Sequence, residues 1–313
     1  MKTIHVQAPG LLTTVQDLGR PGFGPIGVSP SGAADPISLR LGNRLVGNEE
    51  SAAALEMTLL GGTFVFPQGA ILALTGSDFD AALNDVRVNL GASLYVRPGQ
   101  TLRLGSTSSG ARCYVCVQGG IALKPFLGSA STHILSGLGG FDGRPLRKDD
   151  VLHIGRASKR FRKRTIAQQA LENFSRRKVL RVTPGPQGDW FSESSLGAFY
   201  AGTHRVAEQS NRMGVRLEGP AISRRGASDM ITEGVSLGAI QVPAGGSPII
   251  LFVEQQTTGG YPKIANVISA DLHRVGQLRP RDELRFEQVT FDQARALLVE
   301  QEKLLASRGL ILE

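Results

Sequence analysis

The segment Arg97–Leu104 reads RPGQTLRL, and Arg279–Phe286, in the other half of the chain, reads RPRDELRF. Both follow the pattern Arg-Pro-x-x-x-Leu-Arg-apolar, in which a turn-forming start leads into a short apolar run. A weaker third copy, LRKDDVL, occupies Leu146–Leu152. An apolar, strand-like segment precedes each strong copy, at Ile71–Leu74 and Ile249–Phe252. The repetition predicts two similar β-rich domains that arose by duplication.

The composition agrees with β-rich domains of this kind. The chain has 313 residues, of which 41% are hydrophobic and 20% charged, and 39 are glycine. This length is sufficient for two ordinary domains, and many glycines between short apolar runs are typical of strands joined by turns. We therefore expect a mainly β protein with an N-terminal domain over residues 1–155, a basic connector over 156–178 and a C-terminal domain over 179–313.

Two helices are expected within this β-rich chain. Asp35 can cap a helix that begins with Pro36 and has apolar residues at every fourth position up to Leu45. A C-terminal helix follows the capping box at Thr290–Gln293, and Gly309 is expected to end it. The apolar face of this second helix consists of Ala294, Leu297, Leu298, Leu304 and Leu305.

The formal net charge of +8 comes from one segment. Between Arg156 and Lys178 the chain has nine basic residues and one acidic residue, so the remainder of the sequence is balanced. The segment contains no aromatic RNA-binding motif and no zinc-finger spacing, and we interpret it as a solvated connector without a role in the reaction. No nucleic-acid partner is expected.

The two cysteines, Cys113 and Cys116, have C-x-x-C spacing, but the residues around them have the character of a strand. Positions three apart in a strand face opposite sides, so we expect two buried structural thiols rather than a redox pair. Two thiols without a disulfide framework indicate a reducing compartment. The N-terminus shows no apolar signal region, and no apolar run reaches membrane-spanning length, so we expect a cytoplasmic protein that does not contact membranes.

Several short motifs match known signatures only in form. Gly22–Gly27 fits G-x-G-x-x-G, but Pro25 prevents the helix that a dinucleotide site requires. Gly27–Gly32 resembles a nucleophile elbow in the wrong register. The chain has no P-loop sequence, and its five histidines have no metal-binding spacing, so no metal site is expected.

The most polar loop follows the apolar run Ile249–Val253. Residues Glu254–Lys263 read EQQTTGGYPK, which places amides, hydroxyls, a phenol and an ammonium group within one short segment. Two glycines allow the backbone to approach a ligand closely. Three further segments are richer in polar groups than turns require: Thr13–Gly22, Gly128–Thr132 and Ser210–Leu217.

Taken in order along the chain, these segments resemble one family. The matching residues are Thr13–Gly22, Gly27–Ser29 with Ser31, Gly32 and Asp35, Gly119–Ile121, Gly128–Ser129 with Ser131 and Thr132, Asn211–Gly214 and Thr257–Lys263. The family is that of allophanate hydrolase subunit 2, or the KipI antagonists, which includes the C subunit of 5-oxoprolinase and the carboxyltransferase region of urea carboxylase. Two positions depart from its pattern: Glu254-Gln255 replaces an expected Asp-Arg pair, and Arg281 replaces a glycine.

The resemblance implies two tandem cyclophilin-like β-barrels and a function within an assembly. In the oxoprolinase branch, a KipI-type protein and a lactam-utilisation-type protein join the chain as further subunits, and the complex cleaves 5-oxoproline to L-glutamate with ATP. In the carboxylase branch, the region transfers a carboxylate from carboxybiotin to urea, with biotin as cofactor. A third alternative is a non-catalytic regulator that binds a KipI-type partner. We expect the first, with ATP bound at the level of the complex and this chain inactive alone.

A site for lactam cleavage must hold a carboxylate and stabilise a developing oxyanion. Lys263, Tyr261 and Thr258 are the expected catalytic residues. Arginine offers a bidentate fork to carboxylates, which points to Arg212 and Arg216 as substrate ligands. The further expected substrate-binding residues are Thr257, Gly259, Gly260, Gln255 and Ser131.

Overall fold

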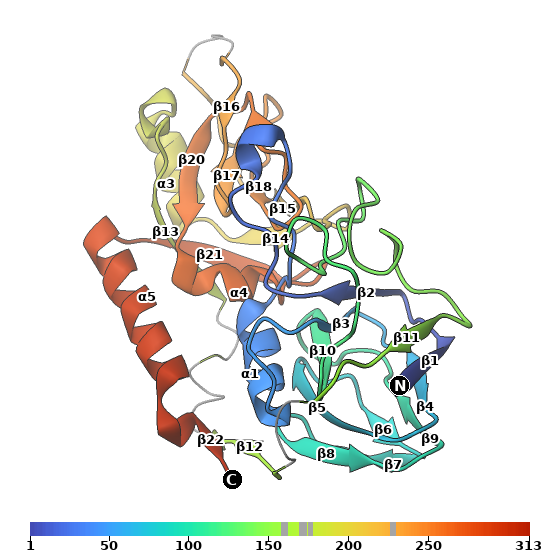
Figure 1. The fold of residues 1–313 in the computed structure, drawn as a ribbon. Helices are drawn as coiled ribbons and strands as arrows, with labels where there is room; N and C mark the ends of the chain where they lie inside the picture. Colours follow the sequence, from blue (N-terminus) through green and yellow to red (C-terminus); the bar gives the residue numbers. More distant parts are fainter. Residues whose placement is uncertain (158–161, 169–173, 175–177, 226–229) are drawn as a thin grey trace. The chain divides into compact units, whose positions relative to one another are not determined.

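A computed structural model describes the chain except for residues 158–161, 169–173, 175–177 and 226–229 (Figure 1). The described chain forms two compact units. The first unit comprises residues 1–20, 31–175 and 307–313, and the second comprises 21–30 and 176–306. The chain is thus divided at places other than the expected boundaries, because 21–30 groups with the second unit and 307–313 with the first. Much of the basic connector falls in the undescribed residues.

Two large antiparallel sheets and helix α1 make up most of the described part of the first unit (Figure 1). Its six-stranded sheet has the order β11-β1-β4-β9-β6-β7, and its five-stranded sheet has the order β2-β3-β10-β5-β8. The strands are β1 (Thr3–Ala8), β2 (Leu12–Gln16), β3 (Ala54–Thr58), β4 (Thr63–Phe66), β5 (Ala70–Gly76), β6 (Ala82–Leu83), β7 (Val86–Arg87), β8 (Ser93–Val96), β9 (Gln100–Arg103), β10 (Arg112–Val117) and β11 (Val151–His153).

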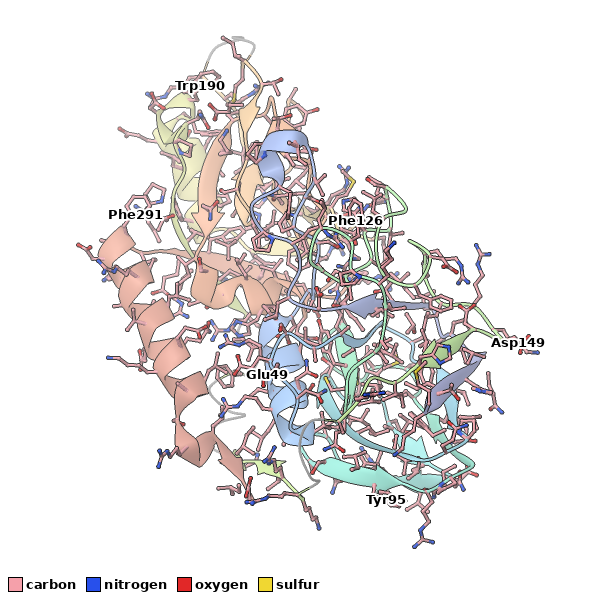
Figure 2. All side chains as sticks on the ribbon, in the orientation of Figure 1. Glu49, Tyr95, Phe126, Asp149, Trp190 and Phe291 are labelled. Carbon is pink, nitrogen blue, oxygen red and sulfur yellow. The ribbon has the colours of Figure 1, made fainter. Side chains whose placement is uncertain are left out.

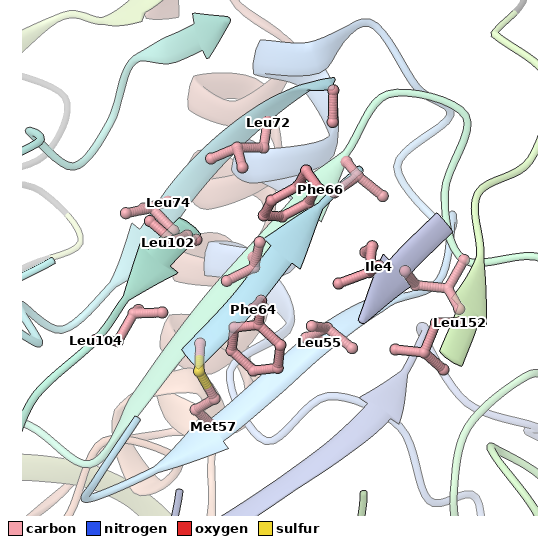
Figure 3. Packing of buried hydrophobic residues seen from close by; sticks show 14 of the residues in the cluster. Ile4, Leu55, Met57, Phe64, Phe66, Leu72, Leu74, Leu102, Leu104 and Leu152 are labelled. Atoms are coloured by element: carbon pink, nitrogen blue, oxygen red, sulfur yellow. The ribbon is translucent and has the colours of Figure 1, made fainter. Parts of the chain in front are cut away.

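The core of the first unit lies between the two sheets. Phe64 and Phe66 of β4 are fully buried against Leu55 and Met57 of β3 and Leu72 of β5 (Figure 3). Along β4, Phe64 and Phe66 alternate with the half-buried Thr63 and Val65, as expected for a strand with one face in a core. Fully burying an aromatic or aliphatic side chain of this size contributes about 1.5–3 kcal/mol.

Helix α1 (Pro36–Val46) covers the other face of the five-stranded sheet. Asp35 caps it by accepting a hydrogen bond from the Ser38 backbone N–H at 3.0 Å, as predicted. A Cβ on Gly42 would lie 2.6 Å from the sulfur of Cys116, so this position requires glycine for close helix–sheet packing. Cys116 thus faces the helix, whereas Cys113 lies in the core between the sheets. Burial raises the pKa of both thiols, which confirms the prediction of buried structural cysteines.

The C-terminal residues return to the first unit. Strand β12 (Thr165–Ile166) pairs with β22 (Ile311–Leu312), and the 3-10 helix η4 (Arg308–Leu310) precedes β22. The Arg164 guanidinium contacts the Glu313 carboxylate at 2.8 Å and donates to the Arg44 carbonyl oxygen at 3.1 Å. The described middle of the basic connector is therefore attached to the first unit by a strand and an ion pair, rather than solvated throughout as expected.

The second unit contains a closed barrel with the strand order β13-β20-β17-β18-β15-β14-β21. Its strands are β13 (Val179–Pro184), β14 (His204–Val206), β15 (Gly214–Glu218), β17 (Ala239–Gln241), β18 (Ile249–Leu251), β20 (Lys263–Val267) and β21 (Glu283–Gln288). A separate two-stranded ribbon consists of β16 (Glu233–Gly234) and β19 (Thr258–Gly259). The mainly β fold class with a β-barrel is thus confirmed.

Helices and short turns surround this barrel. They are η1 (Gly24–Ile26), η2 (Gly188–Trp190), α3 (Glu193–Ala201), η3 (Ser269–Asp271), α4 (Leu272–Val275) and α5 (Phe291–Ala306). The predicted capping box is present, because the Thr290 N–H donates to the Gln293 side chain and the Gln293 N–H donates to the Thr290 hydroxyl. Helix α5 ends at Ala306, so the prediction that Gly309 ends it is wrong. Phe291 at its first position lies at the surface (Figure 2).

The repeated sequence frame folds into the same turn three times. Its third position has a positive φ in every copy: 80° at Gly99, 70° at Asp149 and 71° at Arg281. Asp149 lies at the tip of the turn before β11 (Figure 2). In each copy the first residue's N–H donates to the fourth residue's side chain, in the pairs Arg97–Gln100 (2.7 Å), Arg147–Asp150 (2.7 Å) and Arg279–Asp282 (2.8 Å). The frame therefore specifies a turn and the start of the strand that follows it.

Candidate functional site

Lys263 begins strand β20 and is the one cation of the predicted catalytic set. Its side chain is only 5% exposed. The strand carries a β-bulge here, because Gln241 pairs with Lys263 while Ile240 pairs with Ala265, which leaves Ile264 as an extra residue. Bulges redirect neighbouring side chains and are frequent beside active sites. The extra residue brings Lys263 and Asn266, which are three positions apart, to the same face of the strand, and both line one pocket.

The partner of Lys263 is Glu233, which the sequence did not indicate. The Lys263 ammonium donates to Glu233 Oε1, and the Gln187 side-chain amide donates to the same oxygen at 2.9 Å. These hydrogen bonds, first that of Lys263 and then that of Gln187, hold the pKa of the Glu233 carboxyl below its ordinary value. Glu233 is held in place by the ribbon, where it pairs with Gly259 of β19.

A pocket of about 340 Å³ opens beside this ion pair. It lies wholly within the second unit. Its lining residues are Pro186, Glu233, Gly234, Ser236, Ala239, Lys263, Ala265 and Asn266. The Ser236 hydroxyl donates to Asn266 Oδ1 at 2.8 Å, and Asn266 Nδ2 donates to the Val267 carbonyl at 2.9 Å. The pocket thus combines one buried cation, one carboxylate and a fixed hydroxyl–amide pair.

The predicted loop Glu254–Lys263 covers Gln241 of strand β17, and we refer to it as the cover. Gln241, which is 1% exposed, donates to the Tyr261 carbonyl and accepts from the Gln256 amide, both at 3.4 Å. A Cβ on Gly259 would lie 2.5 Å from Gln241 Nε2, so a larger residue here would displace this buried amide. Gly260 has no such close neighbour, because a Cβ built on it would lie 3.4 Å from its nearest atom, Thr232 Oγ1.

Gln255 and Thr257 stabilise this cover through backbone contacts. The Gln255 amide, oriented so that both its ends are bonded, donates to the Ser236 carbonyl and accepts from the Leu237 N–H, each at 3.1 Å. The Thr257 carbonyl accepts from the Val235 N–H at 3.1 Å. Both residues therefore position the segment that carries Glu233 and Ser236. Thr258 and Tyr261 have exposed side chains.

Arg212 forms a different ion pair. Its guanidinium Nε donates to Glu254 Oε1, and the two side chains are only 5% and 2% exposed. The Arg212 carbonyl also accepts from the Glu254 N–H at 2.9 Å. Glu254, one of the residues that depart from the family pattern, is thus the anion that neutralises Arg212.

Arg216 lies in the same cross-strand row as Lys263 but three strands away. It pairs with Ile249, Ile249 pairs with Gln241, and Gln241 pairs with Lys263. Neighbouring strands are about 4.8 Å apart, which separates the two backbones by roughly 14 Å. Arg216 is exposed and does not line the pocket.

Ser131 belongs to the first unit and takes part in a buried hydrogen-bond cluster there. Its hydroxyl donates to Asp17 Oδ1 at 2.5 Å and accepts from the Asp17 N–H at 2.9 Å. Ser129 donates to the same carboxylate at 2.6 Å, and the Arg20 guanidinium donates to the Ser131 carbonyl. The hydroxyl-rich segment 128–132 therefore stabilises the loop after β2, and the polar loop 13–22 is its partner.

Sequence reasoning missed Glu233, Gln187, Ser236 and Asn266. Glu233 is 30 positions from Lys263, and Gln187 is 76 positions from it. No local pattern indicates such pairings, because they join segments that are distant in sequence. The spacing of Lys263 and Asn266, three positions apart at the start of a strand, is a weak signal of a shared site. Only the β-bulge places both side chains on one face.

Among the described residues, no group of three potential metal ligands converges, and no helix is long and apolar enough to cross a membrane. The polar groups of the site are fixed hydrogen-bond donors that converge on one carboxylate. A buried ammonium with an amide beside it can hold a carboxylate or stabilise negative charge on an oxygen.

Comparison with known proteins places the chain in a family. The profile described as "Carboxyltransferase domain, subdomain A and B" matches residues 26–288. The chain is 38% identical to the 5-oxoprolinase C subunit of Escherichia coli over 94% of both chains, and 36% identical to that of Haemophilus influenzae over 91% of this chain and 90% of the relative. Urea amidolyase of Saccharomyces cerevisiae is 35% identical over 97% of this chain, which spans 18% of that protein.

Solved structures lead to the same family. The urea amidolyase of K. lactis superimposes with a TM-score of 0.92 at 34% identity over 99% of this chain, and the urea carboxylase of Kluyveromyces lactis with 0.90 at the same identity and coverage. The chain spans about a fifth of the first structure and 30% of the second. The family resemblance inferred from the sequence is confirmed, and the chain belongs to the family of carboxyltransferase domains with subdomains A and B.

Proposed function

We propose that this chain is a subunit of an ATP-dependent 5-oxoprolinase that cleaves 5-oxoproline to L-glutamate. The observation that carries the proposal is the 38% identity to a 5-oxoprolinase C subunit across 94% of both chains. The name of that relative denotes one subunit of several. A KipI-type protein and a lactam-utilisation-type protein are the proposed partners, and this chain is inactive alone.

The proposed chemistry requires activation of a poor electrophile. The lactam amide is stabilised by resonance, so transfer of the ATP γ-phosphoryl group to the lactam oxygen gives a leaving group and opens the carbon to water. The sequence of this chain contains no P-loop, and we assign ATP binding to the assembly. The role of this chain is to hold the substrate with Lys263 and Gln187 and to stabilise negative charge on an oxygen in the pocket.

The test is reconstitution. The chain is purified together with its KipI-type and lactam-utilisation-type partners, and glutamate and ADP are measured after addition of 5-oxoproline and ATP. We expect both products in equal amounts from the three together and none when this chain is omitted. A well-folded assembly of all three that releases no glutamate contradicts the proposal, and partner binding without any turnover favours a regulator.

Lys263→Met provides the residue-level test within that assembly. Loss of a donor that stabilises developing charge lowers turnover by about 10²–10³-fold. Lys148→Met is the matched control, because Lys148 is an exposed lysine of the first unit. Equal turnover for both variants would remove Lys263 from the reaction.

A second candidate is carboxyl transfer from carboxybiotin to urea. It is favoured by the TM-score of 0.92 to the K. lactis urea amidolyase over 99% of this chain. The measurement is transfer of labelled carboxylate from a carboxylated biotinyl protein to urea, with and without this chain. Labelled product that depends on the chain, together with no glutamate in the reconstitution, replaces the first proposal with the second.

A further inference from the structure

The Lys263–Glu233 ion pair is unequal in burial. The lysine side chain is 5% exposed and the glutamate side chain is 45% exposed. Glu233 can move into water at little cost, because nearly half of its side chain is already hydrated. Lys263 cannot, and an ammonium left in the pocket wall without an anion would be strongly unfavourable. Departure of Glu233 therefore requires another anion at the same place.

The second donor at this place remains fixed when Glu233 is absent. Gln187 Oε1 accepts from the Lys263 backbone N–H at 3.1 Å, which directs Gln187 Nε2 toward the Glu233 carboxylate. The orientation of this amide is thus set by β20 and not by Glu233. Lys263 Nζ and Gln187 Nε2 together form a preorganised pair of donors that converge on one carboxylate oxygen.

The pocket beside these donors matches a small monoanion. Its volume is about 340 Å³, and Lys263 is the single cation among the described residues that line it. Ser236 and Asn266 bond to each other and to the backbone, so they add polar surface without charge. Pro186, Ala239 and Ala265 supply apolar contact for the uncharged part of a ligand. A dianion such as phosphate would retain one uncompensated charge here.

We propose that this pocket binds small carboxylates by exchange, with the ligand carboxylate replacing Glu233 on Lys263 and Gln187. Glu233 then acts as a built-in competitor that occupies the donors while the pocket holds no ligand. Its depressed pKa agrees with this role, because the shift arises from the hydrogen bonds by which Lys263 and Gln187 hold the charged carboxylate. If the proposed 5-oxoprolinase function holds, the ligand is 5-oxoproline and the exchanging group is its carboxylate; this identification alone rests on that function.

The experiment measures binding to the purified full chain by isothermal titration calorimetry. The probes are acetate, 5-oxoproline and 2-pyrrolidinone, which is the same lactam without the carboxylate. We expect Glu233→Gln to bind acetate and 5-oxoproline about tenfold more tightly than the wild type, because its competing charge is absent. Binding of 2-pyrrolidinone should not change. Glu218→Gln, which removes an equally exposed carboxylate elsewhere on the barrel, should behave as the wild type.

Two further variants test the donors. Lys263→Met should abolish carboxylate binding, and Gln187→Ala should weaken it several-fold while circular dichroism shows an unchanged fold. Gln187→Ala keeps the test decisive if Lys263→Met does not fold. Unchanged or weaker binding by Glu233→Gln overturns the proposal, and so does unchanged binding by Gln187→Ala.

The outcomes separate this proposal from the proposed function. Acetate binding that is enhanced by Glu233→Gln, together with no glutamate from the reconstituted assembly, supports the carboxylate exchange and rejects the oxoprolinase. Glutamate release by the assembly, together with no effect of Glu233→Gln on binding, supports the oxoprolinase and rejects the exchange.

Discussion

Arg281 adopts a left-handed backbone conformation, with φ of 71°, at a turn position where the first copy of the same frame has Gly99. An L-residue pays about 1–2 kcal/mol for this conformation, whereas glycine does not. The Arg281 side chain is 79% exposed and pairs with Glu208 at 2.7 Å, which contributes about 0–1 kcal/mol. The departure of this residue from the family pattern is therefore a matter of stability and lies at the edge of a strand.

We predict that Arg281→Gly is more stable than Arg281→Ala by about 1 kcal/mol, because both lose the ion pair and only glycine relieves the backbone strain. Urea unfolding followed by the fluorescence of Trp190, the chain's one tryptophan and a residue of the second unit, measures the difference. At Arg285, in the following strand, the order should reverse. Greater stability of the Ala variant at both positions would show that the turn imposes no strain.

The two glycines of the loop over Gln241 should respond differently to one methyl group. Gly259→Ala places a Cβ 2.5 Å from Gln241 Nε2, and displacement of this buried amide shifts the loop. Gly260→Ala meets its nearest atom at 3.4 Å, an ordinary contact. We expect carboxylate binding to fall several-fold in the first variant and to stay near the wild-type value in the second. Calorimetric titration with acetate makes the comparison, and equal losses would indicate that Gly260 is also constrained.

Whether a residue of the candidate site could be predicted depended on how far away in sequence its contacts lie. The loop Glu254–Lys263 was predictable because its polar groups and glycines are contiguous. The roles of Gln255, in holding segment 235–237, and of Arg212, in a buried pair with Glu254, were not, because both depend on contacts with other segments. Arg216, an expected substrate ligand, lies three strands from Lys263 and is exposed, a position that follows from strand pairing and not from neighbouring residues.

At the scale of secondary structure, local signals were sufficient for the helix starts and the repeated turn. Asp35 and the Thr290–Gln293 capping box satisfy backbone donors within one helical turn. Because these contacts join residues close in sequence, the sequence alone predicts them. The end of α5 was missed because Gly309 lies in η4, beyond a break that follows Ala306. The strand pairing of the basic connector depends on residues 311–312, and no neighbouring residue signals it.

This pairing gives a prediction for the connector. Arg164 bonds to Glu313 and to the Arg44 carbonyl with a side chain that is only 19% exposed. Arg164→Gln should lower the free energy of unfolding of the first unit by about 1–2 kcal/mol, because it removes charge-assisted hydrogen bonds. Lys163→Gln, at the exposed neighbouring position, should change it by no more than about 0.5 kcal/mol. Thermal unfolding compares the two variants. Equal melting temperatures would show that the contacts of Arg164 do not stabilise the first unit.

At the scale of the molecule, a buried histidine couples stability to pH. His204 is 0% exposed, its Nε2 bonds to the Phe199 carbonyl at 2.9 Å, and the rings of Phe199 and Phe286 lie against it. Burial lowers the pKa of His204, and the hydrogen bond to Phe199 opposes this only in part. The unfolded chain therefore binds a proton that the folded chain resists, over a range that begins near the ordinary histidine pKa of about 6.5.

The second unit should therefore become less stable as the pH falls. Above about pH 6.5 His204 is neutral in both states and contributes no slope, and as the pH falls below that value the second unit loses stability by at most about 1.4 kcal/mol per pH unit, until the folded pKa is reached. Urea unfolding at pH 7.5, 6.5 and 5.5, followed by Trp190 fluorescence, should show this slope in the wild type and a smaller one in His204→Leu. His153→Leu, at an exposed position of β11, is the control and should keep the wild-type slope.

The mainly β class was accessible from sequence, because glycine-rich turns between short apolar runs repeat along the whole chain. The division of the chain into units was not. Residues 21–30 and 307–313 each group with the unit whose remaining sequence is far from them. Long-range groupings of this kind depend on tertiary packing, which leaves no signal in the segments themselves.

The grouping of these two segments has a consequence for the chain as a polypeptide. A fragment of residues 1–174 carries ten residues of the second unit, and a fragment of residues 178–313 carries the last strand of the first. Each fragment therefore lacks one segment of its own unit, 307–313 in the first case and 21–30 in the second. Expressed as two separate polypeptides in one cell, they should complement each other and co-purify on a single affinity tag, whereas each fragment alone should be insoluble or degraded.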